Sequence, residues 1–248
     1  MLIVCVFSYI KLKGKPLVKK PNLPGYFAYG FEFVILIILL ILNVNNARAC
    51  FYQEEAVNLQ FPFRNGTYLI NDGGDGAISS LLDYHYQSKS NIRLGYNKAE
   101  RYANDIKKLD ALGFEGTNFG NEKDLESYYI YDETVYSPCD GEISFVQYGY
   151  DDLQLGETYY NTGNGVVIKM GDVYIMLWHL KKDSILVKQG DTIKAGDPLA
   201  KIGNSGITQT PHLHIHAART HFLYGKGVPI IYDSINPIKN RIYRKTLS

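Results

Sequence analysis

The chain has 248 residues, which is enough for one sizeable domain or two small ones. Its 26 Lys and Arg balance 25 Asp and Glu, so it lacks the basic excess of most nucleic-acid-binding proteins, and we expect no nucleic-acid partner. Three cysteines are too few for a disulfide framework and form no Cys-x-x-Cys metal pair. A Cys50–Cys139 disulfide and lipidation of Cys50 both remain open.

Residues 1–49 have the pattern of a signal peptide or an N-terminal membrane anchor. Lysines from Lys11 to Lys20 precede an apolar run over residues 33–42, and Ala47-Arg48-Ala49 matches a signal-peptidase site. The short run is typical of a signal peptide, whereas residues 25–42 together would form about 27 Å of helix, nearly enough to span a bilayer. Lysines before the run predict an exported body in either case, periplasmic or at the cell surface.

The pattern of residues 50–127 predicts secondary structure less clearly than that of the residues that follow. Residues 50–80 have the turns and apolar alternation of a β-rich entry to the body, including an Asn65-Gly66 turn. We expect a short strand over residues 81–86, which carries His85. Residues 97–112 fit a helix through their apolar spacing, and part of the same segment also alternates as a strand. Residues 113–127 are polar and predict a surface loop.

From residue 128 onward, short apolar segments alternate with turn residues. This pattern predicts a mainly β fold, an antiparallel sandwich or open barrel. The predicted strands cover residues 134–137, 141–148, 165–170, 173–180, 192–193, 198–202 and 212–218.

Three of the six histidines lie in one segment, Pro211-His212-Leu213-His214-Ile215-His216. On a strand, His212 and His214 would stand on the same face about 7 Å apart, which allows them to share a metal site. A polar surface strand fits the same pattern. A fourth histidine, His179, ends the segment 173–180, where alternation places it on the face of Val173, Ile175 and Leu177.

The ordered series of motifs resembles the lysostaphin-like, or LytM-type, zinc metallopeptidases, which cut peptide bonds in bacterial cell walls. The resemblance covers about residues 128–220. It rests on a proline-containing strand, a second strand, a histidine segment, a glycine-marked hairpin, a Gly-Asn-Ser-Gly turn and a His-Leu-His segment. In this chain these are residues 134–141, 164–169, 178–180, 187–196, 203–206 and 212–214.

The resemblance implies a Zn²⁺ cofactor with His214 as one ligand, while His179 and His212 transfer protons or stabilise the transition state beside it. Which of these two histidines is the general base stays open. Typical members supply a further His and Asp just before the strand at residue 134, and no histidine lies between His85 and His179 in this chain.

A second resemblance gives candidates for the missing His and Asp further upstream. Some members carry Asn/Asp-x-His-Tyr followed by Gln/Glu-Arg-Tyr-Ala-x-Asp, and this chain has Asp83-Tyr84-His85-Tyr86 and Glu100-Arg101-Tyr102-Ala103-Asn104-Asp105. These motifs imply His85 and Asp105 as the remaining metal ligands. Asp124, Glu122 and Glu126 compete with Asp105 for that role. His216 replaces the acid that often follows His-Leu-His, and we expect it to support a ligand or to be neutral.

The implied architecture is a signal peptide or anchor (1–49), an extension that supplies upstream zinc ligands (50–127), a peptidase core of the duplicated hybrid motif type (128–224) and a tail (225–248). The implied function is an exported zinc metallo-endopeptidase acting on stem or cross-bridge peptides of peptidoglycan. The alternative is a zinc-free module of the same fold that binds the wall or activates another hydrolase. The sequence gives no indication of oligomeric state.

Overall fold

The computed structural model describes residues 23–118, 123–157 and 161–246. The chain divides into two compact units, residues 1–44 and 45–248. The second unit is built mainly of antiparallel strands with few short helices, which confirms the predicted mainly β, antiparallel class. Among the described residues the strands form open sheets rather than a closed barrel.

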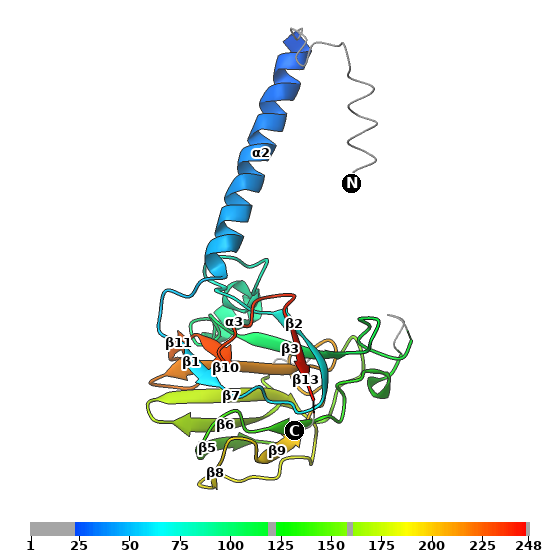
Figure 1. Ribbon diagram of the computed structural model, residues 1–248, viewed down its shortest axis with the longest axis vertical. Coiled ribbons are helices and arrows are strands. Elements are labelled where there is room, and N and C mark those ends of the chain that lie inside the picture. The colour runs from blue at the N-terminus through cyan, green and yellow to red at the C-terminus, as the bar shows by residue number, and fades with distance from the viewer. Residues whose placement is uncertain (1–22, 119–122, 158–160, 247–248) are drawn as a thin grey trace. The chain divides into compact units, whose positions relative to one another are not determined.

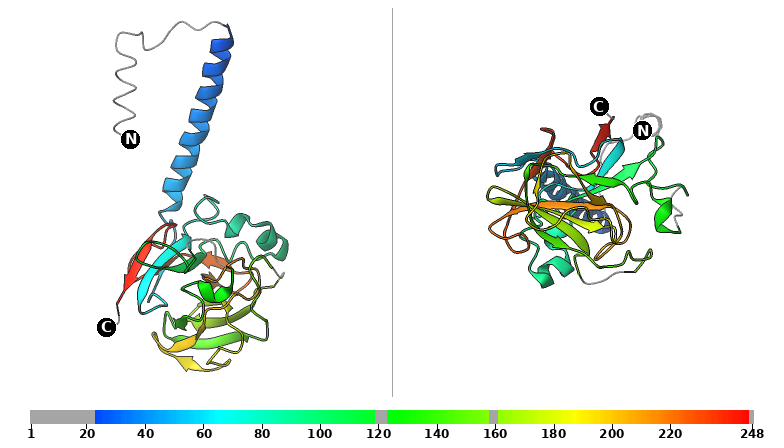
Figure 2. Two further views of the ribbon diagram at one scale, coloured as in Figure 1. Left: turned by 90° about the vertical axis from the view of Figure 1, so that its right-hand side faces the viewer. Right: turned by 90° about the horizontal axis from the view of Figure 1, so that it is seen from below.

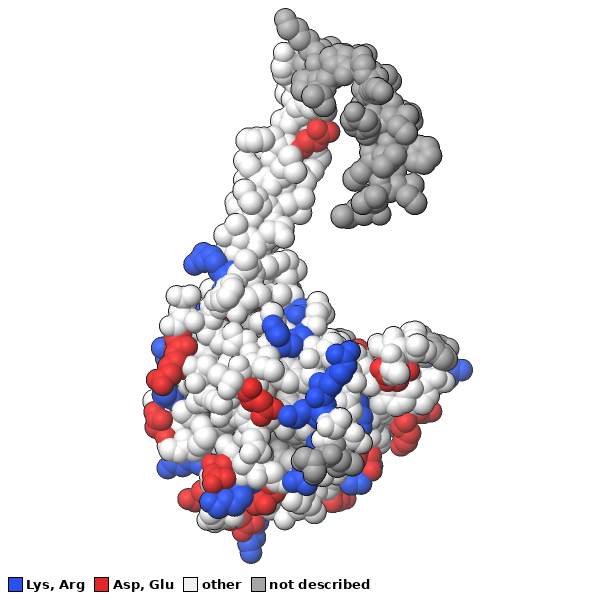
Figure 3. All heavy atoms as spheres, viewed as in Figure 1, with Lys and Arg blue, Asp and Glu red and all other residues white. Residues whose placement is uncertain are grey.

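Helix α2 (Leu23–Ala49) contains the apolar segment expected at the N-terminus. From Tyr26 to Ala49 it is long and apolar enough to cross a membrane. Glu32 and Arg48 are its only charged residues, so its surface is almost entirely uncharged in Figure 3. The lysine-rich segment from Lys11 to Lys20 lies outside the described residues.

The main sheet has nine strands, and every pairing in it is antiparallel (Figure 1). In spatial order they are β13 (Ile242–Lys245), β2 (Gly66–Asp72), β3 (Asn104–Leu109), β10 (Leu213–Arg219), β7 (Val173–Leu180), β6 (Asn164–Met170), β5 (Gly141–Gln147) and β8 (Thr192–Ile193), with β11 (Lys226–Val228) also paired to β10. Figure 2 shows the C-terminal strand β13, in red, beside the cyan strand β2.

Two smaller sheets complete the unit. Strand β1 (Val57–Leu59) pairs in parallel with β12 (Ile230–Tyr232), and β4 (Thr134–Tyr136) pairs antiparallel with β9 (Pro198–Lys201). The helical turns are η1 (His85–Gln87), α3 (Lys89–Leu94) and η2 (Leu125–Ser127).

The central strands are buried on both faces. On one face, Ile175 and Leu177 of β7 and Leu213 and Ile215 of β10 belong to the main hydrophobic core. On the other, a smaller cluster contains Met176 and Trp178 of β7 with Ala99, Val167 and Ala218. Because paired residues share a face, His214, which pairs with Trp178, is held beside this smaller cluster.

The seven strands predicted from residue 134 onward are all found, each within one residue of its expected ends. The strand expected over residues 81–86 is wrong: this segment forms turns that lead into η1. The side chain of Asp83 accepts a hydrogen bond from the backbone N–H of His85, an Asx turn that bends the chain. The helical interpretation of residues 97–112 is also wrong, because residues 104–109 form β3 between β2 and β10.

Candidate metal centre

Strand pairing brings Asp105 and His214 together. In the ladder between β3 and β10, Asp105 lies directly opposite His214, so both side chains project from the same face of the sheet. His214 Nδ1 is 3.0 Å from Asp105 Oδ1, and both residues are buried. Two segments 109 residues apart therefore meet through backbone register alone.

His85 reaches the same point from an irregular segment. Its Nε2 is 3.4 Å from Asp105 Oδ1, and its ring centroid is 4.7 Å from that of His214. Behind it, the fully buried Asp83 lies 2.6 Å from His85 Nδ1 and accepts the His85 backbone N–H at 2.9 Å through the same oxygen. These contacts orient Nε2 toward Asp105, because Nδ1 is the nitrogen that donates to the carboxylate.

A β-bulge places His179. Between β6 and β7, Gly165 pairs with Trp178 and Asn164 with Leu180, so His179 is the extra residue, and it has a left-handed φ of 65°. Strict alternation would direct its side chain into the main core with Leu177, as the sequence pattern predicted. That prediction is wrong, because the bulge turns the side chain toward His212, with ring centroids 4.8 Å apart.

Backbone carbonyls fix the tautomers of His179 and His212. His179 Nδ1 is 2.8 Å from the carbonyl oxygen of Ser205, and His212 Nδ1 is 2.7 Å from that of Thr210. A carbonyl only accepts, so Nδ1 carries the proton in both rings and Nε2 keeps a free lone pair. His212 Nε2 lies 3.5 Å from Asp105 Oδ1, so this lone pair is at the edge of the cluster.

The Gly-Asn-Ser-Gly turn holds His179 from behind. The Ser205 hydroxyl donates to the carbonyl of Leu180 and accepts from the backbone N–H of Asn164, which links the turn to the ends of β6 and β7. A Cβ at Gly206 would lie 2.5 Å from Gly163 N, and Gly206 has a φ of +90°, so glycine is required there. The motif's role here is to position the carbonyl that orients His179.

Burial sets the protonation of the cluster. It lowers the pKa of His179, His212 and His214, and in His179 the neighbouring imidazoles lower it further. Burial raises the pKa of Asp105, but the imidazoles of His85 and His212 outweigh burial and bring it well below its usual range. Three neutral imidazoles therefore face one ionised carboxylate.

His85 behaves differently from the other three imidazoles. Burial lowers its pKa, but the carboxylates of Asp105 and Asp83 contribute in the opposite direction, and the net pKa lies well above its usual value. Burial raises the pKa of Asp83 to about 6, against the opposing effect of His85.

The donor set fits a divalent metal. Ligand atoms of His85, Asp105 and His214 all lie within 4.8 Å of one another, and all three residues are buried. Two imidazoles and one carboxylate are a common protein contribution to a catalytic zinc site, in which a further position stays free. His179 and His212 lie beside this set with free Nε2 lone pairs.

The competing acids lie elsewhere. Asp124 and Glu126 are exposed, and the Asp124 carboxylate accepts the backbone N–H of Ser127 at the start of η2. Glu122 lies outside the described residues. His216 is buried, with Nδ1 3.0 Å from His214 Nε2, so it contacts His214 from the side away from Asp105.

Two residues of the site were not assigned from the sequence. Asp83 orients His85, and its position two residues before the histidine was the available signal, since an Asp at that spacing forms an Asx turn. Glu100 is buried beside His214 and His216, and burial raises its pKa to about 7. Glu100 begins the motif that ends at Asp105, but the motif assigned it no role.

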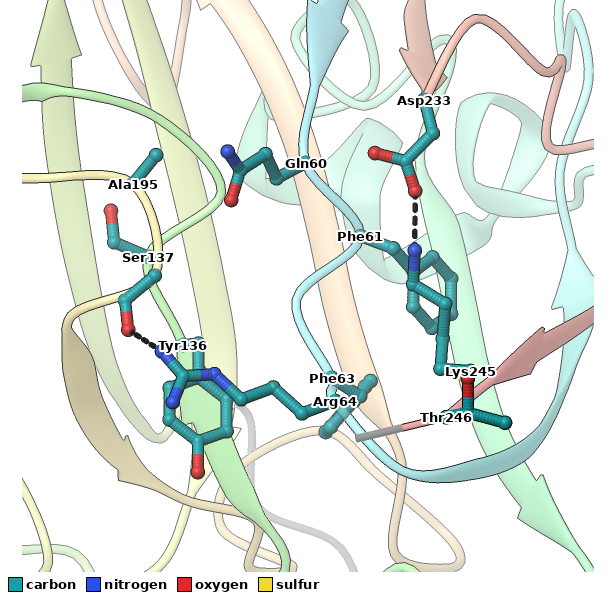
Figure 4. A pocket seen from close by; sticks show the side chains of 11 residues that line it. Gln60, Phe61, Phe63, Arg64, Tyr136, Ser137, Ala195, Asp233, Lys245 and Thr246 are labelled. Atoms are coloured by element: carbon teal, nitrogen blue, oxygen red, sulfur yellow. Dashed lines mark hydrogen bonds and ion pairs between the residues drawn. The ribbon is translucent and has the colours of Figure 1, made fainter. Parts of the chain in front are cut away.

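Two hollows flank the cluster. One of about 400 Å³ is lined by Asp105, His212 and the loop around Thr208, and one of about 60 Å³ is lined by His85, His179 and His214. Tyr84 borders both. A separate polar hollow of about 550 Å³, shown in Figure 4, has Arg64 over the ring of Tyr136 and an ion pair of Lys245 with Asp233. The residues that line this third hollow include no histidine.

Residues 125–228 match the model of peptidase family M23. The chain is 27% identical over 128 residues to the glycyl-glycine endopeptidase ALE-1 of Staphylococcus capitis, a match that covers 51% of this chain and 33% of that protein. It is 38% identical over 81 residues to an uncharacterized metalloprotease of Haemophilus influenzae, covering 32% of this chain and 15% of the relative. The chain thus spans a third or less of the length of these relatives.

Among solved structures, a zinc-containing peptidase from Vibrio cholerae aligns with 26% identity over 49% of this chain and 32% of that chain, with a TM-score of 0.30. His179, His212 and His214 lie inside the segment that matches the family model, whereas His85 and Asp105 lie upstream of it.

Proposed function

We propose, from the match of residues 125–228 to the model of peptidase family M23, that the protein is a zinc metallo-endopeptidase that hydrolyses peptide bonds of peptidoglycan. The proposal rests on the proximity of three buried residues, His85, Asp105 and His214, whose ligand atoms lie within 4.8 Å of one another. In this assignment these three residues hold the zinc, with His214 ligating through Nδ1, the nitrogen that faces Asp105.

When bound, zinc would polarise the scissile carbonyl and activate a water molecule. The chain's own residues supply the proton transfers. Nε2 of His179 and Nε2 of His212 are unprotonated, because each ring donates through Nδ1 to a backbone carbonyl. One accepts a proton from the attacking water, and a protonated imidazole then returns a proton to the leaving amine. Because their pKa values are lowered, both rings start neutral, as a general base requires.

The zinc-free binding module is the second candidate from the sequence. Such a module needs none of these contacts, yet here a carboxylate orients His85, a carbonyl orients His179 and another orients His212. Buried imidazoles with fixed tautomers favour catalysis over binding alone.

The peptidoglycan assignment draws on the similarity to ALE-1, a glycyl-glycine endopeptidase. Stem peptides and cross-bridge peptides are the substrates we propose. We expect the full chain, purified in detergent, to retain about one zinc per chain and to release peptide fragments from purified cell wall. His214→Ala should lose the zinc, and His212→Ala should keep the zinc but reduce fragment release at least 100-fold. Zinc retention without any cleavage would favour the binding module.

We further propose that α2 exports the body and stays as an anchor. At its C-terminal end Ala49 is fully buried, its carbonyl accepts the backbone N–H of Asp75, and Asn46 bonds to Ser79. These contacts support retention of the helix rather than cleavage after Ala49. Membranes washed with carbonate at high pH should keep the intact chain in the pellet. A soluble product that begins at Cys50 would instead identify a cleaved signal peptide.

A further inference from the structure

The small hollow beside the metal centre contains one carboxylate. Its walls include the aromatic side chains Tyr84, Tyr96 and Trp178, and its other lining residues are Ser88, Asn91, Thr162, Ile207 and the three histidines His85, His179 and His214. Glu100 is the only Asp, Glu, Lys or Arg among the lining residues.

Glu100 forms no ion pair with a Lys or Arg among the described residues, and the one nearby group that lowers its pKa by charge is His85, whose nitrogen becomes neutral when it ligates zinc. It is 6% exposed, and the side-chain amide of Asn91 donates to its Oε2 while also donating to the backbone carbonyl of His85 at 3.0 Å. No donor in the described part of the chain is bonded to Oε1. A buried carboxylate with so few partners is costly to keep ionised, and such groups are normally paired.

A carboxylate in a hollow that is also lined by aromatic side chains has the chemistry of an ammonium site. The carboxylate supplies charge-assisted hydrogen bonds, and ring faces attract a cation directly. The hollow of about 60 Å³ exceeds the roughly 10–15 Å³ of probe-occupied volume that holds one water molecule, so a primary ammonium group fits.

We infer that Glu100 binds a primary ammonium group of the substrate, next to the bond that is cut. The inference rests on the proposed function, and it defines the substrate class as peptides with a free amine on a residue flanking the scissile bond. That position follows because a carboxylate oxygen of Glu100 lies within 4.8 Å of a ring nitrogen of His214, a proposed zinc ligand.

The same carboxylate also lies within 4.8 Å of His216, so Glu100, His214 and His216 are sterically able to hold a second metal. The contacts of His214 argue against a second metal. Its Nδ1 faces Asp105 and its Nε2 is hydrogen-bonded to His216 at 3.0 Å, so both nitrogens are in use. The ammonium site leaves that hydrogen bond intact.

The test compares glycinamide with N-acetylglycinamide in equilibrium dialysis against the zinc-loaded full chain in detergent. We expect glycinamide to bind, and Glu100→Gln to weaken its binding roughly 10- to 100-fold, the loss expected for a charge-assisted hydrogen bond. N-acetylglycinamide should bind equally weakly to both proteins. Glu142→Gln, which changes an exposed acid on β5, is the matched control and should bind glycinamide as the wild type does.

Equal binding of glycinamide to wild type and Glu100→Gln would overturn the inference, since zinc alone would then account for it. A wild type with two zinc ions per chain, reduced to one in Glu100→Gln, would also overturn it in favour of a second metal. Failure of the proposed function has a different signature: glycinamide binds through Glu100, but no cell wall is cleaved. If both hold, acetylation of wall amines should slow the wild type at least tenfold and leave Glu100→Gln unaffected.

Discussion

The proposed metal centre has two halves that are built in different ways. His179, His212 and His214 lie on or beside the paired strands β7 and β10, where hydrogen-bonded register fixes their positions. His85 lies in residues 73–103, between β2 and β3, which contain no strand and only the short helical turns η1 and α3. The strand-built half is positioned by the backbone, whereas the loop-built half depends on side chains that bond to the backbone and to each other.

Two acids organise the loop-built half. Asp83 bonds to both the ring and the backbone of His85. Asp75 is paired with Arg101 through two hydrogen bonds, of 2.8 and 2.7 Å, and also accepts the backbone N–H of Ala77 at 3.1 Å. The Asp75–Arg101 pair joins the beginning of residues 73–103 to their end. The backbone makes the same connection, because Gly76 N–H donates to the Arg101 carbonyl. Loss of either acid is expected to affect His85 before it affects the strands.

The largest predicted effect distinguishes a proposed metal ligand in the loop-built half from a proposed proton-transfer residue in the strand-built half. His85→Ala should abolish zinc retention and activity together, because it removes one of the three proposed ligands. His179→Ala should keep about one zinc per chain and lose at least 100-fold in peptide release. Metal analysis after dialysis, with a wall-digestion assay, measures both. Full zinc retention by His85→Ala would show that the loop-built half is not part of the metal centre.

The second-largest predicted effect is on the stability of the loop-built half. Arg101→Ala leaves the buried Asp75 carboxylate without its ion pair, and we expect the free energy of unfolding to fall by about 2–3 kcal/mol. Lys181→Ala removes an exposed ion pair with Asp132 and serves as the control, with a loss below about 1 kcal/mol. Chemical denaturation checks both values. Equal losses in the two variants would mean that the Asp75–Arg101 pair contributes no more than a surface pair.

This division also explains what the sequence could predict. Alternation located β7 and β10 to within a residue, and with them the shared face of His212 and His214. It failed at His179, because a β-bulge inserts one residue and reverses the face, and no residue type near the bulge marks it uniquely.

In the loop-built half, sequence periodicity was misleading. Residues 81–86 alternate like a strand, yet the hydrogen bond from His85 to Asp83 outweighs that local preference. Asp105 was found through a motif resemblance, and its burial opposite His214 depends on long-range strand pairing that local spacing does not encode. Glu100 begins the same motif, and its burial beside the histidines was not predicted for the same reason.

The smallest predicted effect concerns protons at His85. Its raised pKa means that the metal-free protein holds a proton there at pH 7, and zinc must displace that proton to bind Nε2. Zinc affinity should therefore rise with pH, about tenfold per unit from pH 6.5 upward, until His85 is neutral. His179, His212 and His214 add no dependence in this range, because their lowered pKa values keep them neutral.

Asp83→Asn tests the origin of that pH dependence. An amide oxygen still accepts from His85 but carries no charge, so the pKa of His85 should fall and the rise in zinc affinity should move to lower pH. At pH 8.5 the variant should bind zinc roughly 10- to 100-fold more weakly, because the less basic imidazole is a poorer ligand. Competition with a fluorescent chelator between pH 6 and 8.5 measures both effects. If the two pH profiles coincide, Asp83 holds the turn but does not tune the ligand, and the loop-built half contributes geometry alone.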